Sequence, residues 1–166
     1  MPAAKPRRYP AVLDRSRVGR YPPVVKAGGG YVWDAVLEYR VWCHPERGAP
    51  DTAGGNDYFH AFASHARAAA FAAATRGAEP PLALVLQREY IDEPAPGQYR
   101  HVRETRMTEW PLAFLGRPRR TARTIPEFLA PDAPPNRLDI LRGLAPRPRR
   151  RPPATMAPSR NRKGPS

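Results

Sequence analysis

The residues of this chain that could carry out chemistry gather between Cys43 and His65. Cys43 and His44 are neighbours, and a nucleophilic cysteine needs a base that the fold holds against it. Neighbouring residues on a strand point to opposite faces, and Cys43 falls in the register of the buried face of a predicted strand. We therefore expect a buried, unreactive cysteine.

Metal binding is a second possibility, because the same region holds His44, Asp51, Asp57, His60 and His65. No pair among them has the spacing of an established site such as His-Glu-x-x-His or paired cysteines. A spacing of three residues, as between Asp57 and His60, would suffice on a helix, but no helix is predicted there. The sequence therefore predicts no metal site and no resident cofactor.

A pair of carboxylates, Asp34 and Glu38, is the third candidate, since two carboxylates can share acid–base work. On a strand, their spacing of four residues separates them by about 13 Å. That is too far for both to act on one bond. We interpret the two charges as part of a solvated strand face.

The element that must position these residues is a strand predicted at 31–43. Apolar residues occupy every second position, rich in aromatic and β-branched types, while Asp34, Glu38 and Arg40 stand between them. This alternation predicts one buried and one exposed face. Trp42 is the exception, an aromatic residue on the polar face, and its replacement is expected to change stability little. The candidate surface site is this polar face with the loop that follows it: Asp34, Glu38, Arg40, Trp42, His44, Asp57 and His60.

The remaining elements give a small α+β domain. After a loop to about residue 56, a helix is predicted at 64–76, with Ser64 as N-cap and Gly77 just beyond its end. A strand at 82–90 is apolar on both faces at its start and should be central in the sheet. A turn at 92–97 leads to a third strand at 99–109, whose charges suit a sheet edge, and then to a short helix at 110–115. The expected fold is a sheet of about three strands with one packed helix, in the order strand, loop, helix, strand, strand, short helix.

Basic charge and proline lie mainly outside this domain. The net charge is +6 over residues 1–30, −3 over 31–116 and +10 over 117–166, which together give +13. A proline-rich, basic segment buries too little apolar surface to offset its ordering entropy. We therefore expect a flexible arm at 1–26, a domain at 27–116, an extended segment at 117–143 and a disordered tail at 144–166. Two short apolar pieces at 125–129 and 138–141 would dock on the domain or bind a partner.

The basic ends suggest nucleic-acid contact without sequence preference. The arginines that would make it are Arg117, Arg119, Arg120, Arg147, Arg149, Arg150 and Arg151. With one cysteine the chain forms no internal disulfide, which suits a reducing cytoplasm. No apolar run approaches the ~20 residues of a membrane span, so no membrane contact is expected.

Two runs of the sequence are similar to short bacterial proteins identified as GNAT-type (general-control-related) N-acetyltransferases. They are KAGGGYVWDAVLEYRVWCHPERG at 26–48 and PLALVLQREYIDEP at 81–94, and the resemblance extends over about 24–130. It implies acetyl-CoA as cofactor. The family's Arg/Gln-x-x-Gly-x-Gly/Ala motif, in a turn from a strand into a helix, does not occur here, so the resemblance transfers no catalytic residue.

Three functions follow from these observations. The residues favour a non-catalytic module that binds a protein or ribonucleoprotein partner. The resemblance implies an acyltransferase-related protein that uses acetyl-CoA. The basic ends suggest nonspecific nucleic-acid binding.

Overall fold

The computed structural model describes residues 8–23 and 30–149 of the chain, and it confirms the α+β class. A four-stranded antiparallel sheet has the order β2-β1-β3-β6, and β4 and β5 form a separate two-stranded sheet. The strands are β1 Ala35–Cys43, β2 Tyr58–Phe62, β3 Leu82–Gln87, β4 Tyr90–Ala95, β5 Gln98–Val102 and β6 Arg106–Pro111. The helices are α1 His65–Ala74, α2 Thr124–Leu129 and α3 Arg137–Leu141, with 3₁₀ turns η1 Arg15–Arg17, η2 Pro45–Arg47 and η3 Leu112–Gly116. The sheet therefore has more strands than the three expected.

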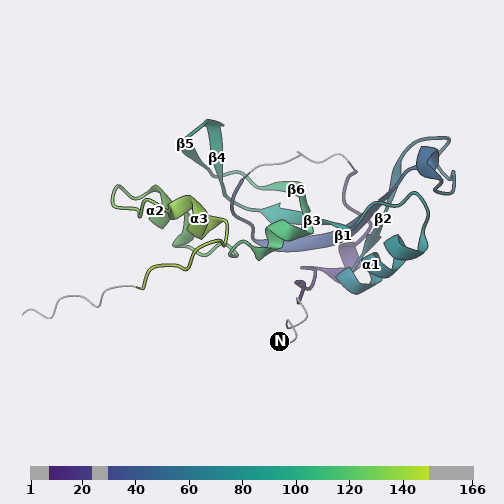
Figure 1. Ribbon diagram of the computed structural model, residues 1–166, viewed down its shortest axis with the longest axis horizontal. Coiled ribbons are helices and arrows are strands. Elements are labelled where there is room, and N and C mark those ends of the chain that lie inside the picture. The colour runs from purple at the N-terminus through teal and green to yellow at the C-terminus, as the bar shows by residue number, and fades with distance from the viewer. Residues whose placement is uncertain (1–7, 24–29, 150–166) are drawn as a thin grey trace, which may run out of the picture.

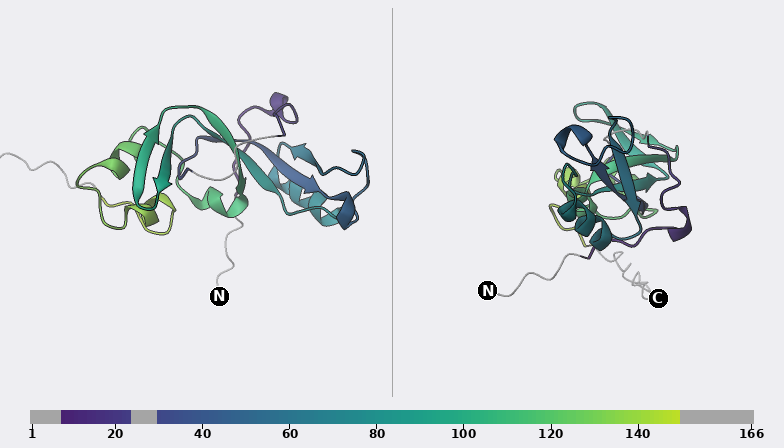
Figure 2. Two further views of the ribbon diagram at one scale, coloured as in Figure 1. Left: turned by 90° about the horizontal axis from the view of Figure 1, so that it is seen from above. Right: turned by 90° about the vertical axis from the view of Figure 1, so that its right-hand side faces the viewer.

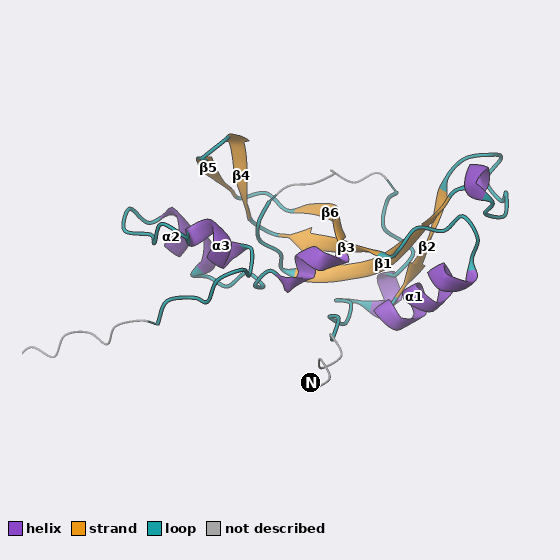
Figure 3. Ribbon diagram, in the orientation of Figure 1, coloured by secondary structure: helices purple, strands orange, loops and turns teal. Residues whose placement is uncertain are grey.

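The molecule is elongated, with different elements at its two ends (Figure 1). One end carries α1, β2 and η2, and the other carries the β4–β5 hairpin with α2 and α3 (Figure 2). The four-stranded sheet fills the middle of the molecule, and α1 lies toward one end and α2 and α3 toward the other (Figure 3). Among the described residues, no helix is long and apolar enough to cross a membrane.

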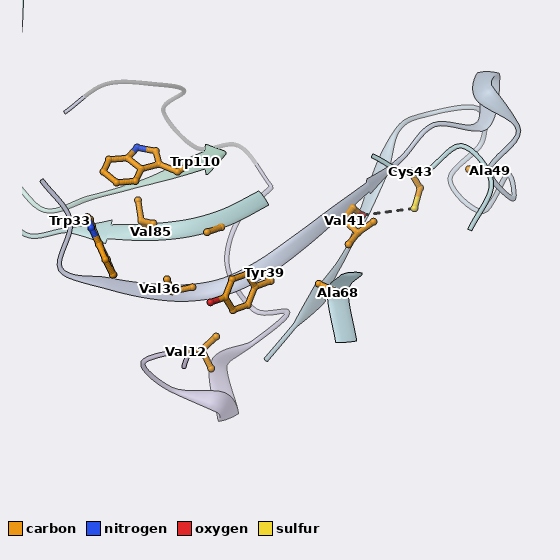
Figure 4. Packing of buried hydrophobic residues seen from close by; sticks show 11 residues of the cluster. Val12, Trp33, Val36, Tyr39, Val41, Cys43, Ala49, Ala68, Val85 and Trp110 are labelled. Atoms are coloured by element: carbon orange, nitrogen blue, oxygen red, sulfur yellow. Dashed lines mark hydrogen bonds between the residues drawn. The ribbon is translucent and has the colours of Figure 1, made fainter. Parts of the chain in front are cut away.

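β1 is one of the two inner strands of the sheet, and both of its faces are buried. Tyr39, Val41 and Cys43 are fully buried in the main core, where Ala68 of α1 lies beside them (Figure 4). On the opposite face Glu38 and Arg40 are also 0% exposed. The prediction of a solvated polar face is therefore wrong.

A β-bulge explains part of the difference between the predicted and the observed faces of β1. The pairing of β1 with β3 shifts between Val36 and Glu38, and such a bulge places one extra residue in the strand. Leu37 consequently leaves the face of Tyr39 and packs with Tyr21 and Leu84 in a second cluster. Strict alternation along β1 is broken at this point.

The N-terminal segment explains the rest, because residues 8–23 cover β1. Val12 forms a parallel bridge with Val36, and the N–H of Leu13 donates to the Val36 carbonyl at 2.8 Å. The Tyr39 hydroxyl donates to the Pro10 carbonyl, and burial raises the pKa of Tyr39 to about 12. The flexible arm predicted at 1–26 is therefore wrong for residues 8–23, while residues 1–7 and 24–26 lie outside the described residues.

β2 is a strand that the sequence did not predict. It pairs antiparallel with the end of β1, from Tyr39 opposite Phe62 to Cys43 opposite Tyr58. The apolar residues of 58–62 do not alternate cleanly with polar ones, so no period-2 signal marks the strand.

The helix and the inner position of the strand after it are confirmed, but β3 ends at Gln87 and Tyr90 of the predicted strand begins β4. α1 begins after Ser64, whose side chain accepts from the Arg67 N–H at 3.3 Å. Gly77 has φ +75°, and a Cβ there would lie 2.4 Å from the Ala49 nitrogen, so only glycine fits. β3 pairs with β1 on one side and β6 on the other.

The predicted third strand at 99–109 divides into two strands in different sheets. β6 pairs antiparallel with β3 and is an edge strand, as expected, whereas β5 pairs with β4. The expected turn at 92–97 is narrower than predicted, because β4 runs to Ala95 and β5 starts at Gln98. The short helix η3 begins at Leu112, and Trp110 belongs to β6 with 1% exposure.

The segment after residue 116 packs against the β4–β5 hairpin. Ile125 and Phe128 of α2 and Leu141 of α3 are buried. They share a cluster with Tyr90 and Ile91 of β4. The two apolar pieces thus dock within the same chain.

Candidate functional site

The seven residues of the predicted site lie in separate places. The first group is a buried ion-pair network on the covered face of β1. Arg40 Nε donates to Glu38 Oε1 at 2.7 Å and Nη1 to Glu109 Oε1 at 2.9 Å. The remaining Arg40 nitrogen donates to the Pro22 carbonyl at 2.8 Å, and the Gly19 N–H donates to Glu38 Oε2 at 2.8 Å.

This network satisfies its charges internally. Buried charges persist where they are paired and hydrogen-bonded, and both carboxylate oxygens of Glu38 and all three nitrogens of the Arg40 guanidinium have partners. The guanidinium also lies 4.2 Å from the centre of the Phe59 ring. Glu38 and Arg40 therefore hold the sheet and the N-terminal segment together and do not face a ligand.

Trp42 belongs to the same network. Its Nε1 donates to Glu109 Oε1 at 3.0 Å, and its ring lies 5.0 Å from that of Phe59. The expectation that Trp42 lies outside the packed structure is not met. We expect Trp42→Phe, which keeps an aromatic ring, to lower the free energy of unfolding by about 1.5–3 kcal/mol, because the hydrogen bond is to a charged acceptor. Urea denaturation measures this.

The control for this substitution is Tyr58→Phe. The Tyr58 hydroxyl donates to the Pro50 carbonyl at 2.6 Å in an exposed position. Loss of a solvated, neutral hydrogen bond should change stability by less than about 1 kcal/mol. Equal losses of stability in the two variants would show that the hydrogen bond from Trp42 to Glu109 contributes no more than a solvated, neutral hydrogen bond.

The second group surrounds Asp34, whose side chain is only 5% exposed. Asp34 Oδ2 accepts from the Arg88 N–H at 2.7 Å, and Oδ1 accepts from Arg120 Nε at 2.9 Å. Arg120 also pairs with Glu89 at 2.9 Å. Asp34 and Arg120 therefore join the start of β1 to the segment after η3.

Arg117 and Arg119 also lie against the folded chain. The Arg117 guanidinium is 3.8 Å from the Phe114 ring centre, and burial lowers its pKa, helped by the nearby charge of Arg142. Arg119 lies 4.9 Å from the ring of Trp33. Contrary to the expectation of a basic tail, Arg117, Arg119 and Arg120 pack on the domain.

Arg147 and Arg149 line a groove formed by α2, α3 and the chain that follows them. Its volume is about 340 Å³. Apolar groups of Phe128, Ala130, Pro134, Ile140 and Leu141 contribute to its lining, along with Arg119, Arg123, Arg137, Arg147 and Arg149 and the acids Glu127 and Asp132. Arg150 and Arg151 lie outside the described residues.

The groove carries a net positive charge. Glu127 pairs with both Arg123 and Arg147, so a single carboxylate is shared by two guanidinium groups. Arg137 donates to the Phe128 carbonyl at 2.8 Å, which is a neutral acceptor. Arg123 and Arg137 were not among the residues predicted from the sequence. Their position next to the two apolar pieces was the available signal.

The third group is at the other end of the molecule, around His44. Its Nδ1 is 2.9 Å from Asp57 Oδ1, and its Nε2 is 3.0 Å from Glu79 Oε1. Glu46, which the sequence analysis did not include, also reaches this group. His60 is separate: it is exposed on β2 and its ring lies 4.7 Å from that of Phe71.

Cys43 is buried, as expected. It is fully inaccessible, its Sγ–H donates to the Val41 carbonyl at 3.8 Å, and burial raises the pKa of its thiol (Figure 4). A thiol that is protonated and inaccessible is a poor nucleophile.

Acetyl-CoA binding of the kind that the resemblance implies would use backbone N–H groups in a turn from a strand into a helix. Among the described residues, β2 leads into α1 through Ala63 and Ser64, without glycine. The Arg67 N–H at this helix start is already bonded to Ser64 Oγ.

The chain matches no protein-family model, no curated protein and no solved structure.

Proposed function

We propose that this protein is a non-catalytic binding module that holds an acidic, amphipathic segment of a partner protein in the α2–α3 groove. The observation that supports it is the composition of the groove, an apolar lining together with five arginines against two acids. Apolar side chains of the partner contact the lining, and its carboxylates pair with the arginines. Arginine suits this role because its planar guanidinium binds carboxylates in a bidentate manner.

The lining favours a polypeptide over a nucleic acid. Single-stranded nucleic acids bind through exposed aromatic rings on which bases stack. Phe128 is the aromatic residue of the groove, and it is only 4% exposed. Aliphatic groups such as those of Pro134 and Ile140 fit the Leu or Phe side chains of a peptide. The binding takes place in the cytoplasm.

Fluorescence anisotropy with a labelled peptide in which Asp or Glu flank Leu and Phe tests the proposal. The intact chain should bind this peptide, with an affinity that falls as salt increases. Arg123→Gln and Arg149→Gln together should weaken binding by about 2- to 30-fold, since each lost charge pair at a solvated site typically contributes about 0.2–1 kcal/mol.

The matched control is Arg103→Gln, which removes the same charge at a side chain that is 78% exposed and outside the groove. Its affinity for the peptide should equal that of the unchanged protein. An equal loss in the control would mean that only net charge matters, and the groove would not be the site.

Two other ligands separate the proposal from its alternatives. Tight, salt-dependent binding of a single-stranded RNA without binding of the peptide would replace the proposal with a ribonucleoprotein or nucleic-acid role. A ligand at ~100 times its dissociation constant stabilises a protein by about 2.7 kcal/mol. A rise in melting temperature with acetyl-CoA would therefore replace it with the acyltransferase-related function.

A further inference from the structure

His44 and Asp57 are brought together by the register of β1 and β2. The last pair of this ladder is Cys43 opposite Tyr58, so the next two positions outward are His44 and Asp57. Directly opposed residues of antiparallel strands have their Cβ atoms about 4.5–5.5 Å apart. Two residues separated by a long loop in the sequence therefore face each other at the end of the sheet.

The segment after α1 flanks His44 on its other side. The His44 N–H donates to the Gly77 carbonyl at 2.9 Å, and the Glu79 N–H donates to the Trp42 carbonyl at 2.8 Å. These bonds place the Glu79 carboxylate beside His44 Nε2 at 3.0 Å. Glu79 also pairs with the exposed Arg47 at 3.2 Å.

Glu46 completes the group because the chain turns immediately after His44. The 3₁₀ turn η2 begins at Pro45 and carries Glu46 in its first turn. The ligand atoms of His44, Glu46 and Asp57 all lie within 4.8 Å of one another. Glu46 and Asp57 are exposed, so an ion has access from solvent and the carboxylates have room to adjust.

The state of the His44 ring provides the second observation. His44 is only 9% exposed, yet neither ring nitrogen makes a hydrogen bond with a described residue. Asp57 Oδ1 lies 2.9 Å from Nδ1 and Glu79 Oε1 lies 3.0 Å from Nε2, so each ring nitrogen faces a carboxylate. Ligand atoms at about 2.0–2.2 Å from a tetrahedral metal ion are about 3.3–3.6 Å apart, and they need no hydrogen-bond angle between them. The 2.9 Å contact between His44 Nδ1 and Asp57 Oδ1 therefore has to lengthen by about 0.5 Å when an ion binds, which the exposed Asp57 side chain allows.

We propose that His44 Nδ1, Asp57 and Glu46 bind a divalent transition-metal ion, for which Zn²⁺ is the reference. One neutral imidazole and two carboxylates offset the two positive charges of the ion. An imidazole nitrogen favours Zn²⁺ over Mg²⁺ and Ca²⁺, which prefer oxygen ligands only. Glu79 is a positioning residue: its carboxylate lies 3.0 Å from the other ring nitrogen, Nε2, and a carboxylate beside that nitrogen commonly orients the ring of a metal-bound histidine.

This site is independent of the proposed function, because η2 and the α2–α3 groove lie at opposite ends of the molecule (Figure 1). Loss of one should leave the other unchanged. Failure of peptide binding therefore says nothing about metal binding.

Isothermal titration of the full chain with ZnCl₂, after treatment with a chelator and dialysis, tests the proposal. The protein should bind one Zn²⁺ per chain and give no heat with MgCl₂. Glu46→Gln and Asp57→Asn should each weaken zinc binding at least tenfold. Both are isosteric changes at exposed side chains, so the fold is retained. Glu79→Gln should weaken it by about 10–100-fold, as expected for a residue that orients a ligand.

The matched control is Glu104→Gln, which removes an exposed carboxylate from outside the group and should leave the zinc affinity unchanged. With Co²⁺ in place of Zn²⁺, the unchanged protein should show visible absorption bands that Asp57→Asn alters. Zinc binding unaffected by both Glu46→Gln and Asp57→Asn would overturn the proposal, since the ion would then sit on other groups. Absence of binding at submillimolar zinc would also overturn it.

Discussion

Replacement of Arg40 by alanine is expected to lower the free energy of unfolding by about 3–5 kcal/mol, the loss typical of a buried ion pair from which one partner is removed. Arg40 is 0% exposed and donates to Glu38, Glu109 and the Pro22 carbonyl. Without it, the Glu38 carboxylate stays buried at 0% exposure beside an empty volume. Because a domain of this size has about 5–15 kcal/mol of stability in total, the urea midpoint should fall sharply.

Arg100→Ala is the control. Arg100 pairs with Asp92 at 3.0 Å, but its side chain is 66% exposed. Surface ion pairs contribute about 0–1 kcal/mol, so this variant should unfold almost as the unchanged protein does. If the two arginines proved equally dispensable, the charges on β1 would be solvated after all.

A double substitution separates the effect of the unpaired Glu38 charge from the effect of the lost hydrogen bonds. In Glu38→Leu/Arg40→Met both buried charges are replaced by apolar side chains, and such replacements are often neutral or stabilising. We expect the double variant to be more stable than Arg40→Ala alone. A double variant as unstable as the single one would mean that the lost hydrogen bonds to Gly19, Glu109 and Pro22 cause the effect, and unpaired charge does not.

The elements that were predicted correctly from the sequence are those that neighbouring residues determine. The start and end of α1 follow from Ser64 and Gly77, whose side-chain oxygen and positive φ act within a few residues. The central place of β3 follows from its apolar residues on both faces. The burial of Cys43 follows from the alternation along β1. In each case the residues that decide the structure are next to one another in the chain.

The predictions that were wrong depend on contacts between residues far apart in the sequence. Alternation along β1 shows that two faces differ in polarity, but it does not show what covers the polar face. Glu38 and Arg40 are buried because Gly19 and Pro22 supply a donor and an acceptor to them. The bulge at Leu37 then moves an apolar residue to that same face. Neither feature has a signal within the strand itself.

The residues of the predicted site lie apart in the structure for the same reason, because their partners are distant in the sequence. The polar residues of 34–60 are close in sequence, whereas in the fold they contact different partners. Asp34 binds Arg120, Arg40 binds Glu109, and His44 contacts Asp57 and Glu79. Two parts of the predicted site remained together: Glu38, Arg40 and Trp42 form one network with Glu109, and His44 faces Asp57 because β1 and β2 are neighbours in the sheet.

Removal of residues 1–23 is expected to abolish the cooperative fold. The deletion takes away Val12 and Tyr21, which are 9% and 8% exposed, and each buried apolar side chain contributes about 1.5–3 kcal/mol. It also takes away the Gly19 N–H and the Pro22 carbonyl, whose bonds to charged groups are each worth about 1.5–3 kcal/mol. The combined loss is comparable to the whole stability of a domain. Near-ultraviolet circular dichroism and the dispersion of amide resonances should both collapse.

Two comparisons make this expectation specific. Removal of residues 1–7 alone shortens the chain at the same end but leaves every contact just named in place, so its spectra and urea midpoint should match those of the full chain. Tyr21→Ala should lower stability strongly, because its ring packs with Leu37 and Leu84, whereas Leu13→Ala should have little effect, because Leu13 is 55% exposed. A folded, cooperative chain that begins at residue 24 would show that β1 does not need this cover. The buried pair of Glu38 and Arg40 would then have to be stable on a face open to water, which is the arrangement that alternation alone predicts.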